Sequence, residues 1–319
     1  MNPILNIAQK EVYTQLKTKR FYIILGVFAL MAVGGVYLIK WLLSQSLGFE
    51  KLYEGASPFQ IMFTSSFSNA LSNLLPFLGG ALGYDMINRE VKEGTIKLTL
   101  SRPLYRDQFI NGKFLGSAAT ITIGLLMFYT MTLALSLIFG IPIQGRDIVM
   151  LLVTLPFSLI YALVFLGIGM VISTIIKKPS TALIAVIILI IFIQIIYPMV
   201  AGIVAFLMHK EEIISASMSY ANNETYTAQP LPEGYYKSLY GMLYIIPSTH
   251  YGVIVGAIFG TKTDYAEVSG AALFGGSIFE ERSILESLNL VWQNIVILIV
   301  MLLLPFAISY AKFMRMDLR

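Results

Sequence analysis

Residues 180–208 read STALIAVIILIIFIQIIYPMVAGIVAFLM, and no charged residue interrupts them. A helix needs roughly 20 apolar residues to cross about 30 Å of hydrocarbon, so this run is long enough to span a membrane. The rest of the chain agrees: 57% of its residues are hydrophobic and 13% are charged, against about 25% charged in soluble domains. We therefore expect an all-α membrane protein whose residues 1–319 form a single transmembrane domain in the lipid bilayer.

Apolar runs predict six transmembrane helices along the chain. We expect them at about 21–43, 60–84, 113–140, 148–176, 180–208 and 288–311. The first run starts at Phe21 without a small-residue cleavage site after it, so we expect a retained helix and no signal peptide. Residues 1–20 place their apolar side chains on one face, which predicts an amphipathic elbow helix; a polar tail with snorkelling lysines is the alternative.

The distribution of charge predicts how these helices are oriented. Fifteen of the 22 lysines and arginines, but six of the 18 carboxylates, lie on the side that carries both termini and the loop 85–113. Because lysine and arginine are enriched in cytoplasmic loops, we expect cytoplasmic termini and an extracytoplasmic segment 209–287. The net charge of +4 then reflects topology, and we expect no nucleic-acid partner.

The segment 209–287 contains a second apolar stretch, residues 241–260, which Pro247 and three polar residues after it interrupt. Two short re-entrant or interfacial helices fit this pattern better than a seventh crossing. A seventh crossing would also place the positive charges of the C-terminus on the opposite side.

Glycines mark the expected packing sites. Gly252, Gly256 and Gly260 recur every four residues, which gives a flat helical face for close backbone approach. We expect the same packing role for Gly79 and Gly83. The nearby His250 is expected to be a hydrogen-bonded interfacial residue, with a ligand role or a pH gate as alternatives.

The loop between the second and third predicted spans is long and charged. Residues 85–106 read DMINREVKEGTIKLTLSRPLYR. Arg89 and Glu93 are spaced four apart, so residues 85–97 predict a charged helix that Gly94 and Thr95 interrupt.

This loop also carries more apolar residues than a free linker needs. Val91, Ile96 and Leu98 offer a packing surface, and Glu90 and Glu93 add charge beside it. We expect a helix that docks on another protein, and a solvated connector is the alternative.

The second predicted span is the most polar of the six. Ser65, Asn69 and Ser72 lie at helical spacing, with Asn73 adjacent. Polar groups are costly in lipid, so this face must meet another helix or water. Hydrogen bonds between packed helices and the lining of a substrate path are both consistent with the pattern.

Catalytic and nucleotide-binding motifs are absent from the sequence. The chain has no cysteine, and its histidines, His209 and His250, belong to no H-E-x-x-H pair, so we expect neither a metal site nor an enzyme. The sequence lacks a G-x-x-x-x-G-K-[ST] loop, so we expect no ATP or other cofactor bound to this chain. An ATP-independent channel or secondary carrier remains the alternative, although charged mid-span residues and paired broken helices are not evident.

In their order, these features resemble the permease subunits of ABC-2 type transporters, particularly the branch with an isolated membrane domain, related to type V exporters. The resemblance covers the whole length and rests on the elbow helix, the order of the spans, the re-entrant segment and three local elements. These elements are Glu90-x-x-Glu93-Gly94-Thr95, Leu100-Ser101-Arg102-Pro103 and Gly112-Lys113.

The resemblance implies a coupling helix within residues 85–112, seated in a groove of a separate ATPase. The implied coupling residues are Arg89, Glu90, Val91, Glu93, Gly94, Thr95, Ile96, Leu98 and Arg102. It also implies that the re-entrant segment caps the outer side of the translocation path, and that the second and fifth helices flank the central cavity of a dimer. The candidate substrate-path residues are therefore Ser65, Asn69, Ser72, Asn73, Gln194 and Tyr197.

By the same resemblance, two permease subunits, identical or different, would pair with two ATPase subunits that bind ATP and Mg. The expected location is the plasma membrane, and the expected function is export.

Overall fold

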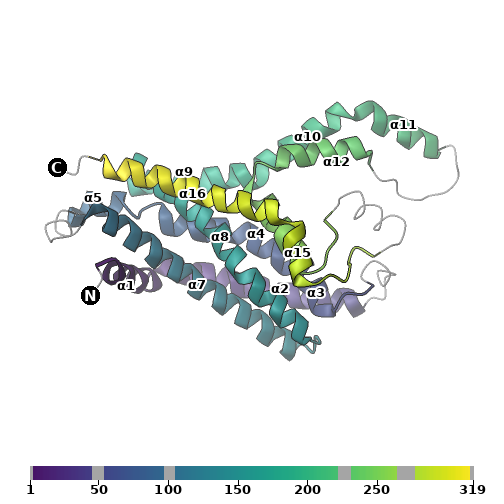
Figure 1. Ribbon diagram of the computed structural model, residues 1–319, viewed down its shortest axis with the longest axis horizontal. Coiled ribbons are helices and arrows are strands. Elements are labelled where there is room, and N and C mark those ends of the chain that lie inside the picture. Colours follow the sequence, from purple (N-terminus) through teal and green to yellow (C-terminus); the bar gives the residue numbers. More distant parts are fainter. Residues whose placement is uncertain (1–2, 45–53, 97–104, 222–230, 264–276, 317–319) are drawn as a thin grey trace.

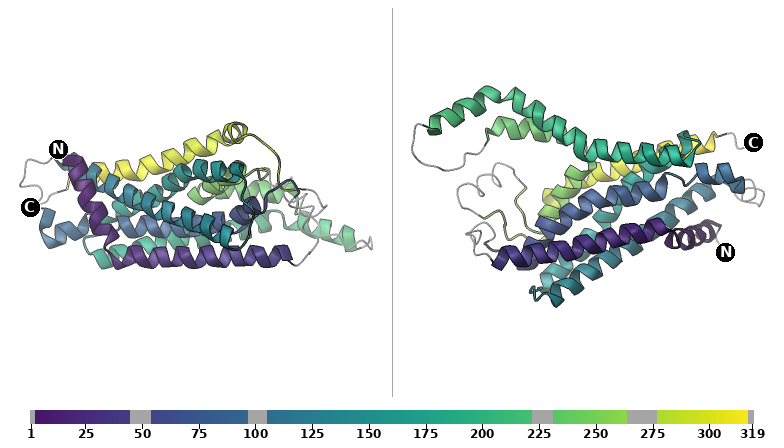
Figure 2. Two further views of the ribbon diagram at one scale, coloured as in Figure 1. Left: turned by 90° about the horizontal axis from the view of Figure 1, so that it is seen from below. Right: turned by 180° about the vertical axis from the view of Figure 1, so that it is seen from behind.

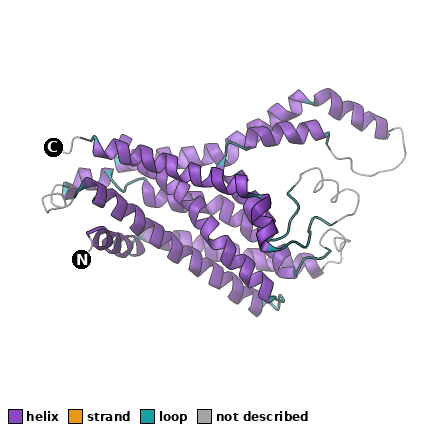
Figure 3. Cartoon of the chain, viewed as in Figure 1, coloured by secondary structure: helices purple, strands orange, loops and turns teal. Residues whose placement is uncertain are grey.

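The computed structural model describes residues 3–44, 54–96, 105–221, 231–263 and 277–316. Helices dominate these residues, and an isolated bridge between Thr261 and Phe279 is the only strand-like pairing among them (Figure 3). The long helices lie side by side, and both ends of the chain lie at one end of the bundle, which we call the termini end (Figure 1). The predicted all-α class is confirmed.

A helix occurs at each of the six predicted positions. The long helices are α2 (Lys19–Ser44), the α3–η1–α4 helix described below, α7 (Arg106–Ile138), α8 (Gly145–Ile175), the α9–η2–α10 helix (α9 Pro179–Ile191, η2 Phe192–Ile196, α10 Tyr197–Met208) and α16 (Trp292–Met314). The short helices are α1 (Pro3–Leu16), α5 (Asn88–Glu93), α11 (Lys210–Ala221), α12 (Glu233–Leu243), α13 (Pro247–Ile258) and α15 (Ile284–Leu290). Among the described residues, five segments are long and apolar enough to cross a membrane, namely Lys19–Leu38, Arg106–Ile138, Gly145–Ile175, Pro179–Met208 and Trp292–Met314.

The helix at the second predicted span is not one of those five. It consists of α3 (Pro58–Met62), a π-helical turn η1 (Phe63–Phe67) and α4 (Ser68–Gly83), which follow one another without a break. Its serines and asparagines make it less apolar than the other five. Four of the five leucines of α4 are buried in the bundle all the same, because α4 packs against α8 and α2.

The predicted break at Pro247 is present. The helices α12 and α13 are joined at a bend of 115°, so together they form either a broken span or a re-entrant loop. Proline disfavours the helical conformation in the residue before it, and Ile246 is indeed extended. The first of the two helices begins at Glu233, earlier than the predicted residue 241. Helix α12 packs back against α10, and α12 and the end of α10 project beyond the bundle together with α11 (Figures 1 and 2).

Helix α8 occupies the centre of the bundle and packs against α4, α7, α9, α13 and α16. Two glycines bring α4 close to it. A Cβ atom at Gly79 would lie 2.2 Å from the carbonyl oxygen of Ala162, and one at Gly83 would lie 2.5 Å from that of Leu166. No side chain fits in this space, so the predicted packing role of both glycines is confirmed.

Replacing Gly79 with alanine should therefore separate α4 from α8. We expect Gly79→Ala to lower the free energy of unfolding by about 1–3 kcal/mol, the usual cost of overpacking, measured from the thermal unfolding of the purified protein in detergent. Gly202→Ala on α10 is the matched control, because nothing lies within 4 Å of a Cβ atom there. Equal thermal stability of the two variants would contradict the close contact between α4 and α8.

Candidate functional site

The short helix α5 is fixed to the bundle at the termini end. The hydroxyl of Ser173 on α8 accepts hydrogen bonds from the backbone N–H groups of Ile87 (2.9 Å) and Asn88 (3.1 Å). The Asn88 side chain is 3% exposed and donates to the carbonyl oxygens of Tyr84 and Ile176. Side chains and backbone thus join α5 to the end of α8. The sequence alone gave no reason to single out Ser173.

A buried ion cluster joins α5 to two further helices. Lys113 of α7 lies 2.7 Å from a carboxylate oxygen of Glu90 on α5 and 2.9 Å from one of Glu11 on α1. All three side chains are largely buried: 6% of Lys113, 15% of Glu90 and 14% of Glu11 is exposed. Buried charges are stable only when they are paired, so the position of each of these three helices depends on the other two. The sequence singled out Lys113 only as part of the Gly112-Lys113 element and did not predict its ion pairs.

Helix α1 lies across the long helices, since Figure 1 shows it nearly end-on, and it packs against α7. Gly112 and Gly116 allow this contact: a Cβ atom would lie 2.8 Å from the Cβ atom of Ile7 at Gly112, and 2.6 Å from that of Glu11 at Gly116. The amide of Gln15 then donates a hydrogen bond to Ser117 (2.6 Å). The amphipathic helix predicted for residues 1–20 is therefore a helix seated on α7.

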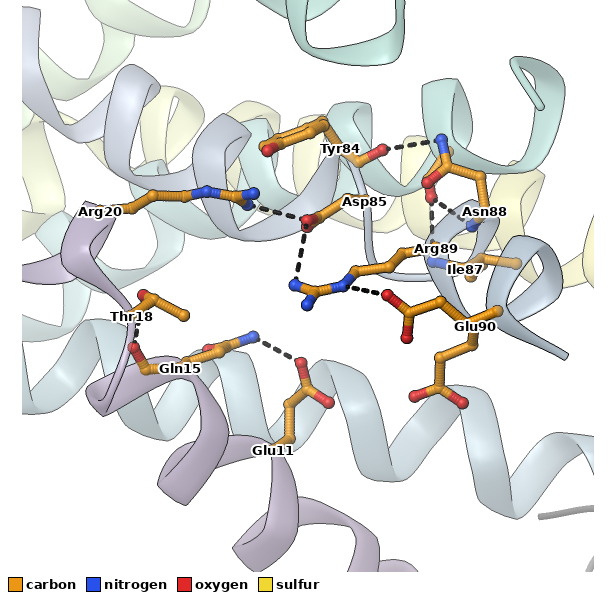
Figure 4. Close-up of polar contacts among 12 residues, drawn as sticks. Glu11, Gln15, Thr18, Arg20, Tyr84, Asp85, Ile87, Asn88, Arg89 and Glu90 are labelled. Atoms are coloured by element: carbon orange, nitrogen blue, oxygen red, sulfur yellow. Dashed lines mark hydrogen bonds and ion pairs between the residues drawn. The ribbon is translucent and has the colours of Figure 1, made fainter. Parts of the chain in front are cut away.

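A second chain of charges runs along the outer side of α5. Asp85 pairs with Arg20 (2.8 Å) and with Arg89 (3.8 Å), and Arg89 also pairs with Glu93 (3.0 Å) (Figure 4). The hydrogen bond to Glu93, together with the nearby negative charges of Glu93 and Asp85, raises the pKa of Arg89 above its ordinary value. These charges and Lys113 line a cavity of about 220 Å³ between α1, α4, α5 and α7.

The candidate coupling residues take different positions. Val91 is 40% exposed and the Glu93 side chain is 50% exposed, so both are open to a partner. Gly94 ends α5 with a φ of 72°, a conformation that suits glycine. The hydroxyl of Thr95 donates to the carbonyl oxygen of Glu90.

Ile96 differs from the expectation. Its side chain is 1% exposed and packs in the hydrophobic core of this chain, where it cannot present the outward packing surface that the sequence suggested. Burial of this large aliphatic side chain anchors the end of the α5 segment instead. Leu98 and Arg102 lie outside the described residues.

The candidate substrate-path residues divide between a cavity and the helix backbone. A cavity of about 490 Å³ lies between α4, α10, α12 and α13, and Asn69 and Ser72 line it. Ser65 and Asn73 are not among its lining residues. Ser65 donates to the carbonyl oxygen of Ile61, Asn69 to that of Ser65, and Asn73 to that of Asn69, each one turn back along the helix.

Gln194 and Tyr197 connect helices. The Gln194 amide donates to the carbonyl oxygen of Ser72 (2.8 Å) and to the Tyr161 hydroxyl (3.2 Å), which ties the π-helical turn η2 to α4 and α8. The Tyr197 hydroxyl donates to the carbonyl oxygen of Met242 (2.9 Å) and so joins α10 to α12. In this structure both residues make hydrogen bonds between helices.

The bent segment of α12 and α13 is held by a buried histidine. Pro247 begins α13, and His250 is fully buried, with its ring nitrogens 2.8 Å from Asn294 Oδ1 and 2.7 Å from the carbonyl oxygen of Tyr244. His250 is thus hydrogen-bonded, as predicted. The tyrosines Tyr251 and Tyr161 stack with ring centroids 4.5 Å apart, a contact between α13 and α8 that the sequence did not suggest.

Gly252, Gly256 and Gly260 do not form the flat packing face that their spacing predicted. Nothing lies within 4 Å of a Cβ atom at Gly252, whereas one at Gly256 would meet the Thr261 hydroxyl at 2.5 Å. Gly260 has a φ of 81° and lies just beyond the end of α13. Gly256 and Gly260 therefore let the chain turn back after the helix, and Gly252 borders the 490 Å³ cavity.

Removing the cation of the buried cluster should destabilise the protein. We expect Lys113→Met to cost about 3–5 kcal/mol, because it leaves two buried carboxylates without their partner, measured from thermal unfolding in detergent. Lys10→Met on α1 is the control, since Lys10 is exposed and forms no ion pair within the described part of the chain. Unfolding of both variants at the temperature of the unchanged protein would contradict the role of the cluster.

Comparison with known proteins agrees with this architecture. The family model described as "ABC-2 family transporter protein" matches residues 5–318. Two similar proteins are named "Probable ABC transporter permease protein NosY". The one from Stutzerimonas stutzeri is 30% identical over 193 residues, which is 57% of this chain and 63% of the relative. The one from Pseudomonas aeruginosa is 31% identical over 133 residues, 40% of this chain and 43% of the relative.

The matched stretches thus span less than two thirds of either relative, whereas the family model covers nearly the whole chain. Together with the apolar helices, the family match shows a multi-pass membrane protein. The chain belongs to the ABC-2 family of transporter proteins.

Proposed function

We propose that this chain is the membrane subunit of an ABC exporter, which moves a substrate with the energy of ATP hydrolysed by a separate subunit. Two such membrane subunits, identical or different, would assemble with two ATPase subunits, and ATP and Mg²⁺ would bind to the latter. The observation that carries this proposal is the family match over residues 5–318. The absence of a phosphate-binding loop from the sequence also favours an external source of energy.

The termini end of the bundle would face the cytoplasm of a plasma membrane. The excess of lysine and arginine on this side supports that orientation, because positive residues are retained in the cytoplasm. The projecting α11, which follows the apolar segment Pro179–Met208, would then lie outside the cell. In this orientation α5 faces the compartment that contains ATP.

Helix α5 would act as the coupling helix. It is short, lies at the termini end, and exposes Val91 and Glu93, which an ATPase groove could contact. Its other side is fixed, because Asn88 bonds to α8 and Glu90 pairs with Lys113 of α7. A push on α5 would therefore move these helices with it, and α5 would not bend alone.

The movement would reach the far end of the bundle through α8. This helix is bonded to α5 at Ser173 and stacks on α13 through Tyr161 and Tyr251. Helix α13 and α4 line the 490 Å³ cavity, so displacement of α8 would change its shape. We propose that this cavity is part of the substrate path.

The chemistry of the cavity suggests the kind of substrate it would accept. Its described lining combines hydroxyl, amide and apolar side chains, with Lys262 as its only charged residue. Such a surface suits a molecule with both apolar and neutral polar groups. On the helix formed by α3, η1 and α4, the side chains of Ser65, Asn69 and Asn73 are also exposed. A polar exposed face is expected where a helix meets water or a second subunit.

Charge reversal on α5 tests the coupling role. We expect Glu93→Arg to reduce, by about tenfold or more, the amount of ATPase that co-purifies with the tagged chain, because the reversed charge faces the partner at the centre of the contact. The fold should be unchanged, since the side chain is half exposed.

Glu281→Arg is the matched control, because Glu281 is also an exposed carboxylate paired with an arginine, Arg146, away from the termini end. It should leave the recovery of ATPase unchanged. Recovery of a stoichiometric ATPase with Glu93→Arg would show that Glu93 of α5 is not needed for the contact with the ATPase. A stable, active complex without any ATPase would indicate an ATP-independent channel or carrier.

The cavity can be tested with two asparagines of the same helix. Asn69→Leu should alter the rate or the selectivity of transport in proteoliposomes at least severalfold and should leave ATPase binding intact. Asn73→Leu should behave like the unchanged protein, because Asn73 makes the same kind of backbone hydrogen bond but does not line the cavity. Equal effects of the two substitutions would indicate that Asn69 only stabilises the helix and does not contact the substrate.

A further inference from the structure

A larger cavity lies at the termini end, on the opposite side of α5 from the ion cluster. Its volume is about 1060 Å³, at the upper limit of the roughly 300–1,000 Å³ typical of small-molecule sites. It lies between α5, the end of α8, the connection from α8 to α9 and the end of α16. Apart from Val91, its lining includes none of the residues proposed to contact the ATPase or to line the substrate path.

The lining of this cavity has two parts. One part is apolar and includes Val91 of α5 and Ile175 and Ile176 at the end of α8. The other part consists of cations from three regions, namely α5, the connection between α8 and α9, and the end of α16, and no carboxylate is among the described lining residues. The cations are Lys92, Lys177, Lys178, Lys312 and Arg315.

These five cations have no compensating charge in the described part of the chain. None of them takes part in an ion pair there, although Arg20, Arg89 and Lys113 at the same end are all paired. All five side chains are exposed at the cavity. Five like charges around one cavity repel each other, so an anion in the cavity would be attracted strongly.

The cavity also lies at the depth in the membrane where lipid headgroups are expected. It sits where three apolar segments end, at Ile175 of α8, Pro179 of α9 and Met314 of α16. The ends of such segments mark the level of lipid headgroups, where lysine and arginine meet phosphate. Ile175 is 55% exposed beside the cations, so an apolar surface continues from the cavity towards the lipid tails.

We propose that this cavity binds the headgroup of an anionic phospholipid, with its phosphate among the cations and the start of its acyl chains against the apolar wall. Basic pockets between transmembrane helices are suited to such headgroups. A soluble acidic partner fits less well, because the wall that continues into the membrane would then remain uncovered.

The lipid composition of the membrane would then affect how the helices at this cavity are held together. Lys92 and Val91 belong to α5, whereas the other walls belong to α8, the connection that follows it and α16. A bound lipid would bridge these elements and cancel the repulsion between them. Its binding does not depend on the proposed transport function.

The test measures binding of short-chain phosphatidylglycerol to the purified full-length chain in a neutral detergent, by isothermal titration. Phosphatidylcholine of the same chain length is the neutral comparison. We expect saturable binding of phosphatidylglycerol, and we expect the double substitution Lys177→Gln/Lys178→Gln to weaken it about 30-fold, that is, about fivefold for each charge lost near the membrane surface. A second double variant, Lys312→Gln/Arg315→Gln, should give a similar loss from a different helix.

The control is Lys17→Gln/Lys19→Gln, which removes two exposed cations from the same end but away from the cavity. It should bind phosphatidylglycerol within about twofold of the unchanged protein. Equal affinity for the neutral lipid, or unchanged binding in both cavity variants, would overturn the proposal.

Two further outcomes would assign the cavity to another occupant and so also overturn the proposal. Inorganic phosphate or ATP that binds as tightly as the lipid would indicate a site for a soluble anion. Cavity variants that keep lipid binding but lose a co-purifying ATPase would indicate a protein interface. Loss of lipid binding together with full ATPase recovery would support the lipid and leave the proposed coupling at Glu93 intact.

Discussion

The position of α5 depends on one buried cation. Transferring a charged side chain from water into a protein interior costs several kcal/mol, and the cost is recovered only when opposite charges surround it with good geometry. Lys113 meets this condition by means of two carboxylates from two other helices, Glu11 and Glu90. The glycines at 112 and 116 bring α1 close enough for the contact. Charge and close packing thus define one geometry for the termini end.

The same region is connected to the rest of the molecule through α8. Near its C-terminal end, Ser173 accepts hydrogen bonds from the backbone at the start of α5. The middle of α8 packs against α4 at Gly79 and Gly83, and its Tyr161 stacks on α13. These contacts are of different kinds, but all join α8 to an element with a proposed role. A helix buried on most of its faces is suited to this, because it cannot tilt without moving its neighbours.

Much of the fold could be predicted because lipid imposes a simple rule: a span must be apolar and about 20 residues long. The six helix positions, the break at Pro247 and the packing of Gly79 followed from that rule and from backbone chemistry. The site was less predictable, because its contacts join residues far apart in the chain. Nothing near Ser173 or Lys113 in the sequence shows which partner each will meet. Ile96 shows the converse: its apolar character was evident, but only the tertiary structure reveals that it faces inward.

The two π-helical turns have a consequence for how related sequences should be aligned. Each turn, η1 in the polar helix and η2 beside Gln194, accommodates one residue more than a regular helical turn. Removing a single residue from either would restore a regular helix but rotate all residues on one side by about 100° relative to the other. In η1 such a deletion would turn Phe59 and Gln60 away from the core, where both are buried, while Asn69 kept its place. One-residue gaps at these two turns therefore carry more structural meaning than substitutions around them.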